Sequence, residues 1–212
     1  MILETAKRVL KIEAESILNL IDKINDNFVR AVDLISTCKG KVVLIGIGKS
    51  GFISKKIAST LSSTGTPAFF LHPAEGVHGD LGMLSPKDVV IVISNSGETN
   101  EVLQLIPLLK HMNLKIIVFT GNANSSLASR GDIIINTSVK EEACPWGFVP
   151  TSSTTAALAM GDALAIAVLK KKGFKQEDFA ILHPGGTLGK RLLLKVTDLM
   201  HRGSAVPLVR EN

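Results

Sequence analysis

The sequence predicts an α/β fold in which helices cover both faces of a parallel β-sheet. Short apolar runs typical of buried strands occur at residues 42–45, 68–71, 89–93, 115–119 and 133–135. Segments with helical character alternate with these runs, at about residues 50–63, 100–112 and 152–171. Strands that alternate with helices at this spacing imply right-handed βαβ crossovers, and therefore strands that all run parallel.

The N-terminal segment is predicted to be helical. Residues 1–38 carry apolar side chains at three- and four-residue steps, which predicts two helices with a break near Asn25–Asn27. An apolar stripe of this length must pack on the sheet or on a second subunit. Shorter helices are expected near residues 125–130 and 176–181, the latter leading into a His183-Pro184-Gly185-Gly186 turn.

Length and composition indicate one well-buried core. The chain has 212 residues, of which 45% are hydrophobic, and it contains no tyrosine. No apolar run approaches the roughly 20 residues that cross a bilayer. The N-terminal segment also lacks the uninterrupted apolar core of a signal peptide. We therefore expect a cytoplasmic protein without a membrane partner.

Charge and cysteine content exclude further classes. The formal net charge is +5, but the basic residues are scattered and no set of aromatic residues accompanies them. Nucleic-acid surfaces combine both features, so we expect no nucleic-acid partner. A mild positive charge does favour an anionic substrate. Cys38 and Cys144 have no metal-ligand spacing and are expected to be buried free thiols rather than redox or catalytic groups.

A glycine-rich turn follows the first predicted strand. The segment 46–51 reads GIGKSG and fits a G-x-G-x-x-G pattern between a strand and a helix. Glycines allow the backbone to approach an anion closely, and a helix N-terminus presents free N–H groups to it. A dinucleotide would need an acidic residue at the end of the second strand, which instead ends in Leu71-His72-Pro73. The turn therefore favours a phosphate over a nicotinamide cofactor.

A serine-rich turn follows the most strand-like run of the chain. The segment 94–99 reads SNSGET, and the side chains of Ser94, Asn95, Ser96 and Thr99 can join backbone N–H groups in binding a phosphate. Ser96 or Thr99 could alternatively be a simple helix cap. One cap needs one such residue, so the cluster favours a ligand. A third cluster, TSSTT at 151–155, fits a cap and a third wall of the same pocket equally well.

Five segments together resemble the SIS (sugar isomerase) domain family, and most closely its arabinose-5-phosphate isomerase branch. They are GIGKSG at 46–51, HPAEGVHGDLGML at 72–84, SNSGETNEV at 94–102, PTSSTTAALAMGDALA at 150–165 and HPGGTLGK at 183–190. The resemblance implies a Rossmann-like, three-layer sandwich with a five-stranded parallel sheet. It also implies interconversion of D-ribulose 5-phosphate and D-arabinose 5-phosphate, the first step toward the Kdo sugar of lipopolysaccharide. A homotetramer with active sites shared between subunits is expected, without a cofactor.

The resemblance also implies a domain organisation. Residues 1–38 would form N-terminal helices and residues 39–195 the SIS domain. The VTDLM segment at 196–200 resembles the start of a first CBS repeat. Residues 196–212 are therefore expected to begin a CBS region that is cut short, either by truncation or naturally. Regulation by CBS domains is not expected from this chain.

Moving a proton between C1 and C2 through an enediol requires a base, an acid and positive charge near the oxygen. The family pattern implies that Lys49, Glu101, Glu142 and His183 supply these groups. Lys49 would neutralise the enediolate or the phosphate, and His183 would open the sugar ring or shuttle a proton. Burial would raise the pKa of the base toward neutrality. We favour Glu142 over Glu101 as that base.

Three further residues are expected to bind the substrate, and two rival functions also fit the sequence. Ser50, His72 and His78 are expected to contact the sugar phosphate, and His72 with His78 could trap an inhibitory zinc ion, although no metal is required. One rival function is a non-catalytic regulatory SIS module that binds a sugar phosphate. Another is an isomerase of a different sugar phosphate. Retention of all four proton-transfer residues favours the enzyme.

Overall fold

The computed structural model describes residues 1–185 and 196–206. Internal contacts divide the chain into two compact units, Met1–Gly173 and Phe174–Asn212. The first unit contains the sheet and every strand named below. In its described residues the second contains three short helical segments, α7 (Gln176–Leu182), α9 (Val196–Leu199) and the 3-10 turn Gly203–Ala205. The expected GGTLGK part of the 183–190 motif and the last residues of the expected CBS region lie largely outside the described residues.

The first unit is built on a five-stranded sheet in the order β2-β1-β3-β4-β5. All neighbouring strands are parallel. The strands are β1 (Val42–Ile45), β2 (Ala68–Leu71), β3 (Val89–Ile93), β4 (Lys115–Thr120) and β5 (Ile133–Asn136). Every residue of β1 and β3 is buried, because both faces of the sheet are covered. The predicted fold class is confirmed.

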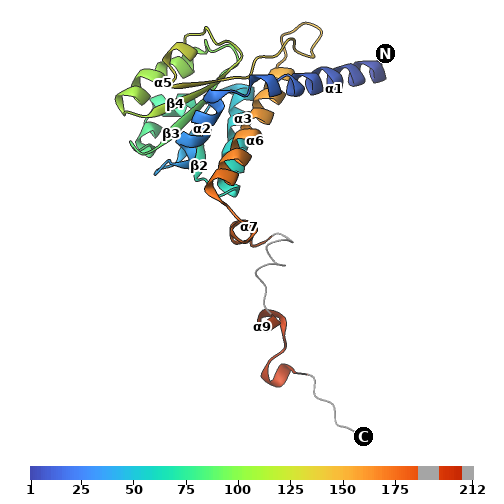
Figure 1. Cartoon of the computed structure of the whole chain (residues 1–212), viewed down its shortest axis with the longest axis vertical. Coiled ribbons are helices and arrows are strands. Elements are labelled where there is room, and N and C mark those ends of the chain that lie inside the picture. The colour runs from blue at the N-terminus through green and yellow to red at the C-terminus, as the bar shows by residue number, and fades with distance from the viewer. Residues whose placement is uncertain (186–195, 207–212) are drawn as a thin grey trace. The chain divides into compact units, whose positions relative to one another are not determined.

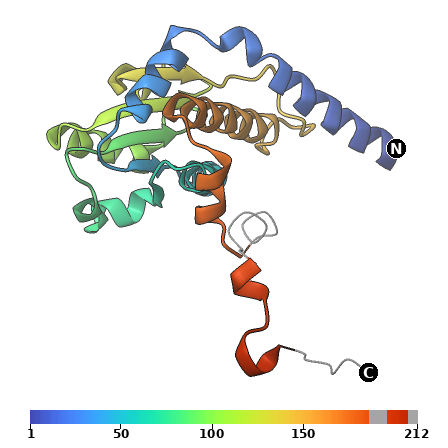
Figure 2. The ribbon, with the colours of Figure 1, turned by 60° about the horizontal axis from the view of Figure 1, so that its bottom comes forward.

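Helices form a layer on each face of the sheet (Figures 1 and 2). One apolar cluster joins the sheet to α2 (Asp26–Ser36), α3 (Gly48–Ser63) and α6 (Ser152–Lys172). A second cluster, on the opposite face, joins it to α5 (Asn100–His111). The short helix α4 (Pro73–Val77) lies against α5. This is the three-layer arrangement expected from the resemblance.

The N-terminal helices differ from expectation in where they break. Helix α1 (Ile2–Leu18) ends earlier than predicted, and a 3-10 turn (Ile21–Lys23) separates it from α2. The side chain of Asn25 caps α2 by accepting from the N–H of Asn27 at 3.0 Å, so the residues predicted to be the break begin the second helix. Helix α1 packs on α6, while its N-terminal end projects beyond the rest of the unit (Figures 1 and 2).

Two short segments escaped the sequence patterns. Helix α4 and the 3-10 turn Asp80–Met83 were not predicted, because each is too short to show a period. The helix expected at residues 125–130 is a single 3-10 turn, Ala128–Arg130. These segments lie in the connections after β2 and β4, where a few residues decide the path of the chain.

Helix α6 is long and apolar enough to cross a membrane when judged by length and composition alone, and within the described part of the chain it is the one such helix. Half of its apolar 18-residue stretch is buried inside the protein. It packs against α1, α2 and α3, and its buried side chains belong to the main apolar cluster. These contacts are those of a core helix.

A glycine sets the distance between α3 and α6. A Cβ atom on Gly161 of α6 would lie 2.2 Å from Cδ1 and 2.5 Å from Cγ1 of Ile57, which is fully buried in α3. Any larger side chain must push the two helices apart or displace Ile57. The first turns of the same two helices line the candidate site described below, so this contact joins the two elements that form its walls.

The close approach predicts a selective loss of stability in Gly161→Val. Overpacking a core by this much lowers the free energy of unfolding by about 1–3 kcal/mol. The control is Ala163→Val on the exposed side of the same helix, beside an open apolar depression that has room for the added methyl groups, so the main loss is helix propensity, less than about 0.7 kcal/mol. Urea denaturation measures both values. Equal stability of the two variants would contradict a tight α3–α6 contact at Gly161.

Candidate functional site

The sheet reverses its direction of growth between β1 and β3. From β1 the chain moves outward to β2, and it then returns to place β3 on the other side of β1. In open α/β sheets, ligands bind in the crevice beyond the carboxyl ends of the strands at such a switch point. The glycine-rich turn leaves β1 there and the serine-rich turn leaves β3. The topology thus brings both phosphate-type turns to one edge of the sheet.

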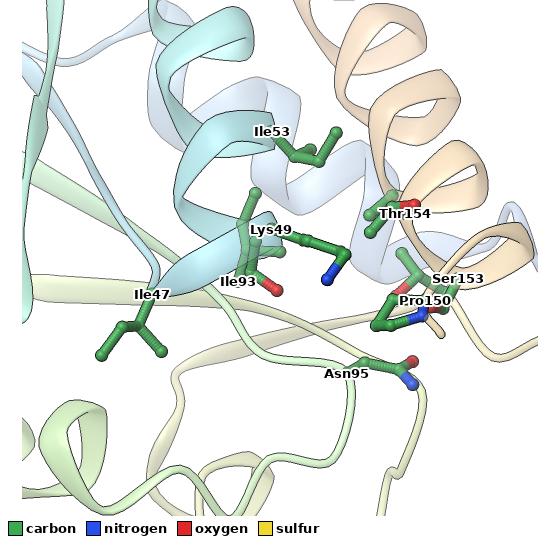
Figure 3. Close-up of a pocket in the computed structure, with 11 residues that line it drawn as sticks. Ile47, Lys49, Ile53, Ile93, Asn95, Pro150, Ser153 and Thr154 are labelled. Carbon is green, nitrogen blue, oxygen red and sulfur yellow. The ribbon is translucent and has the colours of Figure 1, made fainter. Parts of the chain in front are cut away.

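A pocket of about 180 Å³ lies at this edge. Figure 3 shows the Lys49 side chain extending from α3 toward the first turn of α6, with Asn95 across the opening. Three of the predicted site residues, Lys49, Ser50 and Asn95, line the pocket. The other lining residues are Ile47, Ile53, Ile93, Thr137, Pro150, Ser153, Thr154 and Ala157.

The glycine-rich turn has the backbone geometry of an anion-binding turn. Gly48 begins α3 with φ of +57°, a conformation that side chains disfavour. A Cβ on Gly46 would lie 2.8 Å from the carbonyl oxygen of Ser50. The residue at the N-cap of α3 is Ile47, which has no side-chain oxygen to occupy the first N–H groups of the helix. The start of α3 therefore presents its donors, beside the Lys49 ammonium, to an anion.

The serine-rich turn is bonded largely to itself. Ser94 is 3% exposed, and its Oγ lies 3.0 Å from Thr99 Oγ1 and accepts from the N–H of Gly97 at 3.1 Å. Ser96 Oγ accepts from the N–H of Glu98 at 3.2 Å. Thr99 occupies the N-cap position of α5 but forms no side-chain cap bond. Of this turn, Asn95 lines the pocket, and the three hydroxyl residues do not.

A neighbouring segment holds the serine-rich turn in place. Glu98 accepts from the N–H of Ser126 at 2.7 Å, and Leu127 donates its N–H to the carbonyl of Gly97 at 3.0 Å. The backbone and side-chain hydrogen bonds from Ser126 lower the pKa of Glu98. Sequence reasoning did not predict these contacts, because the two segments that form them follow different strands and no local pattern links them.

A carboxylate occupies the N-terminus of α6. Glu142 Oε2 accepts from the N–H of Thr151 at 2.7 Å, from Thr151 Oγ1 at 3.0 Å and from the N–H of Ser153 at 3.3 Å. Thr151 Oγ1 in turn accepts from the N–H of Ala143 at 2.9 Å. A negative group is favoured at this end of a helix. Glu142 therefore caps α6 although it lies nine positions before Thr151 in the sequence. The TSSTT cluster is thus both a capped helix start and a wall of the pocket.

The pKa of Glu142 moves opposite to expectation. Burial would raise it, but the donors of Ser153 and Thr151 together outweigh burial and lower the pKa below its ordinary value of 4.5. The expected rise toward neutrality is therefore wrong for Glu142 in this chain. All the hydrogen bonds that Glu142 accepts from described residues go to Oε2, which leaves Oε1 without one.

The remaining predicted residues lie apart from this pocket. Glu101 and His78 are exposed and do not line it. His72 accepts from the N–H of Ala74 at 3.2 Å and lines a different depression, beside Phe70. Within residues 1–185 and 196–206, no three His, Cys, Asp or Glu side chains gather to hold a metal ion. The expected zinc pair therefore gains no third ligand from the described residues.

His183 belongs to the second unit. Its ring stacks on that of Phe179, with centroids 3.8 Å apart, and its Nδ1 lies 2.9 Å from the carbonyl oxygen of Phe179. Sequence reasoning assigned no role to the lining residues Thr137 and Pro150, nor to the apolar lining residues Ile47, Ile53, Ile93 and Ala157. Thr137 follows β5 as Ser94 follows β3, so a polar residue directly after a buried strand was the available signal.

Comparison with known proteins identifies the family. Residues 34–167 match the model of the SIS domain. The chain belongs to the SIS domain family. The SIS match includes the strands β1 to β5, both phosphate-type turns and Glu142 with the first turn of α6.

Named relatives of this SIS chain come from several bacteria. It is 54% identical over 97% of its length to the arabinose 5-phosphate isomerase KdsD of Yersinia pestis. It is likewise 54% identical over 98% of its length to the KdsD protein of Escherichia coli K12. The chain spans 63% of the length of each of these relatives.

Solved structures show the same fold as this SIS chain. A protein of Escherichia coli CFT073 in complex with arabinose 5-phosphate is 44% identical, with a TM-score of 0.84, and the match covers 86% of this chain and 97% of that one. A putative phosphosugar isomerase involved in capsule formation, from Bacteroides fragilis, is 41% identical, also with a TM-score of 0.84, and covers 88% and 99% respectively.

The cap on α6 predicts a pH-dependent difference between the SIS chain and its Glu142→Gln variant. At neutral pH the variant loses the charged cap, and the free energy of unfolding falls by about 0.5–2 kcal/mol. A carboxyl group with a lowered folded pKa contributes stability above its unfolded pKa, and this contribution disappears as pH falls through the folded pKa. The gap between the two proteins should therefore narrow as pH falls below 4.5.

Urea denaturation over a pH series measures this gap. Glu141→Gln is the matched control, because Glu141 is exposed and accepts no side-chain hydrogen bond from described residues. The control is expected to match the parent protein throughout. A Glu142→Gln deficit that stays constant at every pH would contradict the capping role of the carboxylate.

Proposed function

We propose that the chain is an arabinose 5-phosphate isomerase that interconverts D-ribulose 5-phosphate and D-arabinose 5-phosphate through an enediol. The observation that carries the proposal is 54% identity, over 97–98% of the chain, to relatives that bear this name. A structural neighbour in complex with arabinose 5-phosphate supports the substrate. The pocket at the sheet's switch point is consistent with this reaction, because Lys49 lines it and the Glu142 carboxylate, which does not line it, is bonded to the helix start that forms one wall.

Lys49 and Glu142 are proposed to act on the two sides of the reacting carbons. The Lys49 ammonium lines the pocket beside the uncapped start of α3, which supports a role in neutralising the phosphate or the enediolate. Glu142 is ionised at neutral pH, and this is the form that can accept a proton. Its Oε1 has no hydrogen bond from described residues and is the proposed basic atom. Glu101, exposed and outside the pocket, is the second candidate.

His183 is proposed to open the sugar ring or to shuttle a proton. When Nδ1 donates to the Phe179 carbonyl, Nε2 is left as the acceptor for that work. We also propose a homotetramer with active sites shared between subunits. Exposed apolar side chains on α1, including Ile2, Leu3 and Leu10, support a subunit contact in that region.

The wider assignments follow the same proposal. The serine-rich turn, with Ser94, Ser96 and Thr99 as its hydroxyl residues, and Ser50 would hold the phosphate, and His72 and His78 would approach the sugar from their own segment. The enzyme would act in the cytoplasm in the formation of Kdo for lipopolysaccharide, with no cofactor demanded by the proton transfer. Residues 39–195 are proposed as the SIS domain, after helices at 1–38 and before the start of a CBS region at 196–212.

Incubation of the purified chain with ribulose 5-phosphate in D2O, with a chelator present, tests the proposed reaction. We expect arabinose 5-phosphate to form, and we expect solvent deuterium at C2 of the product because the proton passes through the enzyme's base. Proton NMR measures both. Binding of arabinose 5-phosphate without any conversion would instead favour the regulatory module, and conversion of another sugar phosphate alone would favour the second rival.

Variants test the catalytic roles. Glu142→Gln and His183→Ala are each expected to lower kcat by about a hundredfold, the lower end of what one general acid or base contributes. Lys49→Met should also lower kcat/KM, through loss of positive charge at the pocket. Glu141→Gln is the control and should keep parent activity. Full activity of both Glu142→Gln and His183→Ala, in folded protein, would overturn the catalytic assignment.

A further inference from the structure

Two adjacent serines at the start of α6 carry buried hydroxyl groups without a partner. Ser152 is fully buried and Ser153 is 4% exposed, and neither Oγ atom has a hydrogen-bond partner of good geometry among the described residues, although the Ser153 side chain lies near enough to the Glu142 carboxylate to help lower its pKa. Buried polar side chains are nearly always hydrogen-bonded, so each exception calls for an explanation. The two differ in one respect. Ser153 lines the pocket at the switch point (Figure 3), whereas Ser152 does not.

The charge at this wall of the pocket limits what Ser153 can bind. The Glu142 carboxylate already takes the N–H groups of Thr151 and Ser153. A phosphate bound at the same turn would lie close to this negative charge and would be repelled by it. A neutral hydroxyl group meets no such repulsion, and it can both donate to and accept from a serine Oγ.

The opposite wall has the reverse character. The first turn of α3 has no capping side chain, and Lys49 and Ser50 line the pocket beside it. Asn95 of the serine-rich turn lines the same opening. An anion is favoured at such a helix start. The two helix starts that face the pocket are thus complementary, one ready for an anion and the other already holding one.

We propose that Ser153 determines specificity by hydrogen-bonding a hydroxyl group of the sugar, while the phosphate lies against the turns that follow β1 and β3. This inference takes the identity of the substrate from the proposed function. It adds the orientation of that substrate in the pocket. Ser153 is not a proton-transfer residue in this account. Its Oγ has no bond within the described protein because the ligand supplies it.

Comparison of Ser153→Ala with Ser152→Ala tests this role. Both changes remove one buried, unpartnered hydroxyl and leave intact the backbone N–H groups that Glu142 caps. Neither variant should therefore be less stable in urea than the parent protein, because a group without a partner contributes nothing favourable to the fold. Their effects on binding should differ, because only one of the two hydroxyls faces the pocket.

Isothermal titration calorimetry with arabinose 5-phosphate and with inorganic phosphate measures that difference. We expect Ser153→Ala to raise the Kd of arabinose 5-phosphate about tenfold, as befits one hydrogen bond, and to leave the Kd of inorganic phosphate unchanged. Ser152→Ala should leave both values unchanged.

Three results would overturn the inference. Ser153→Ala could bind arabinose 5-phosphate as the parent does, it could lose affinity equally for inorganic phosphate, or it could unfold more easily. The readout is binding, so a chain that binds without isomerising would fail the proposed function while the variants still decide the role of Ser153. A parent protein that does not bind arabinose 5-phosphate would reject both.

Discussion

The carboxylate of Glu142 at the start of α6 is the interaction on which the arrangement of the pocket depends. It ties the loop after β5 to the helix that forms one wall, and it satisfies N–H groups that would otherwise attract an anion. With this turn occupied, the uncapped start of α3 is the more favourable place for a phosphate. The partly buried charge of Glu142 thus makes the α6 wall of the pocket unfavourable for an anion and leaves the α3 wall favourable.

The parallel sheet supplies the setting for this asymmetry. Because the strand order reverses beside β1, the turns after β1 and β3 meet at one edge, and α3 and α6 point their first turns toward the same opening. Close packing of Gly161 against Ile57 holds the two helices at a fixed separation. The braced serine-rich turn adds a rigid third side. Contacts between separate elements thus hold the walls of the pocket in place.

Sequence patterns predicted the fold well because its strands are short apolar runs and its main helices are long. They placed Lys49, Ser50 and Asn95 at the pocket, since each follows a buried strand. They could not show that Ser94 is bonded within its own turn, nor that Glu142 caps a helix whose N-cap lies nine positions later. Both depend on how separate segments meet in space. The expected rise in the pKa of Glu142 was wrong for the same reason, because its hydrogen-bond donors were invisible in the sequence.

The most direct test of this account is a crystal structure of the chain with arabinose 5-phosphate bound. We expect the phosphate to lie against the first turn of α3 and Asn95, a sugar hydroxyl to bond to Ser153, and Glu142 to stay bonded to Thr151. A phosphate seated on the first turn of α6, with Glu142 displaced, would contradict it.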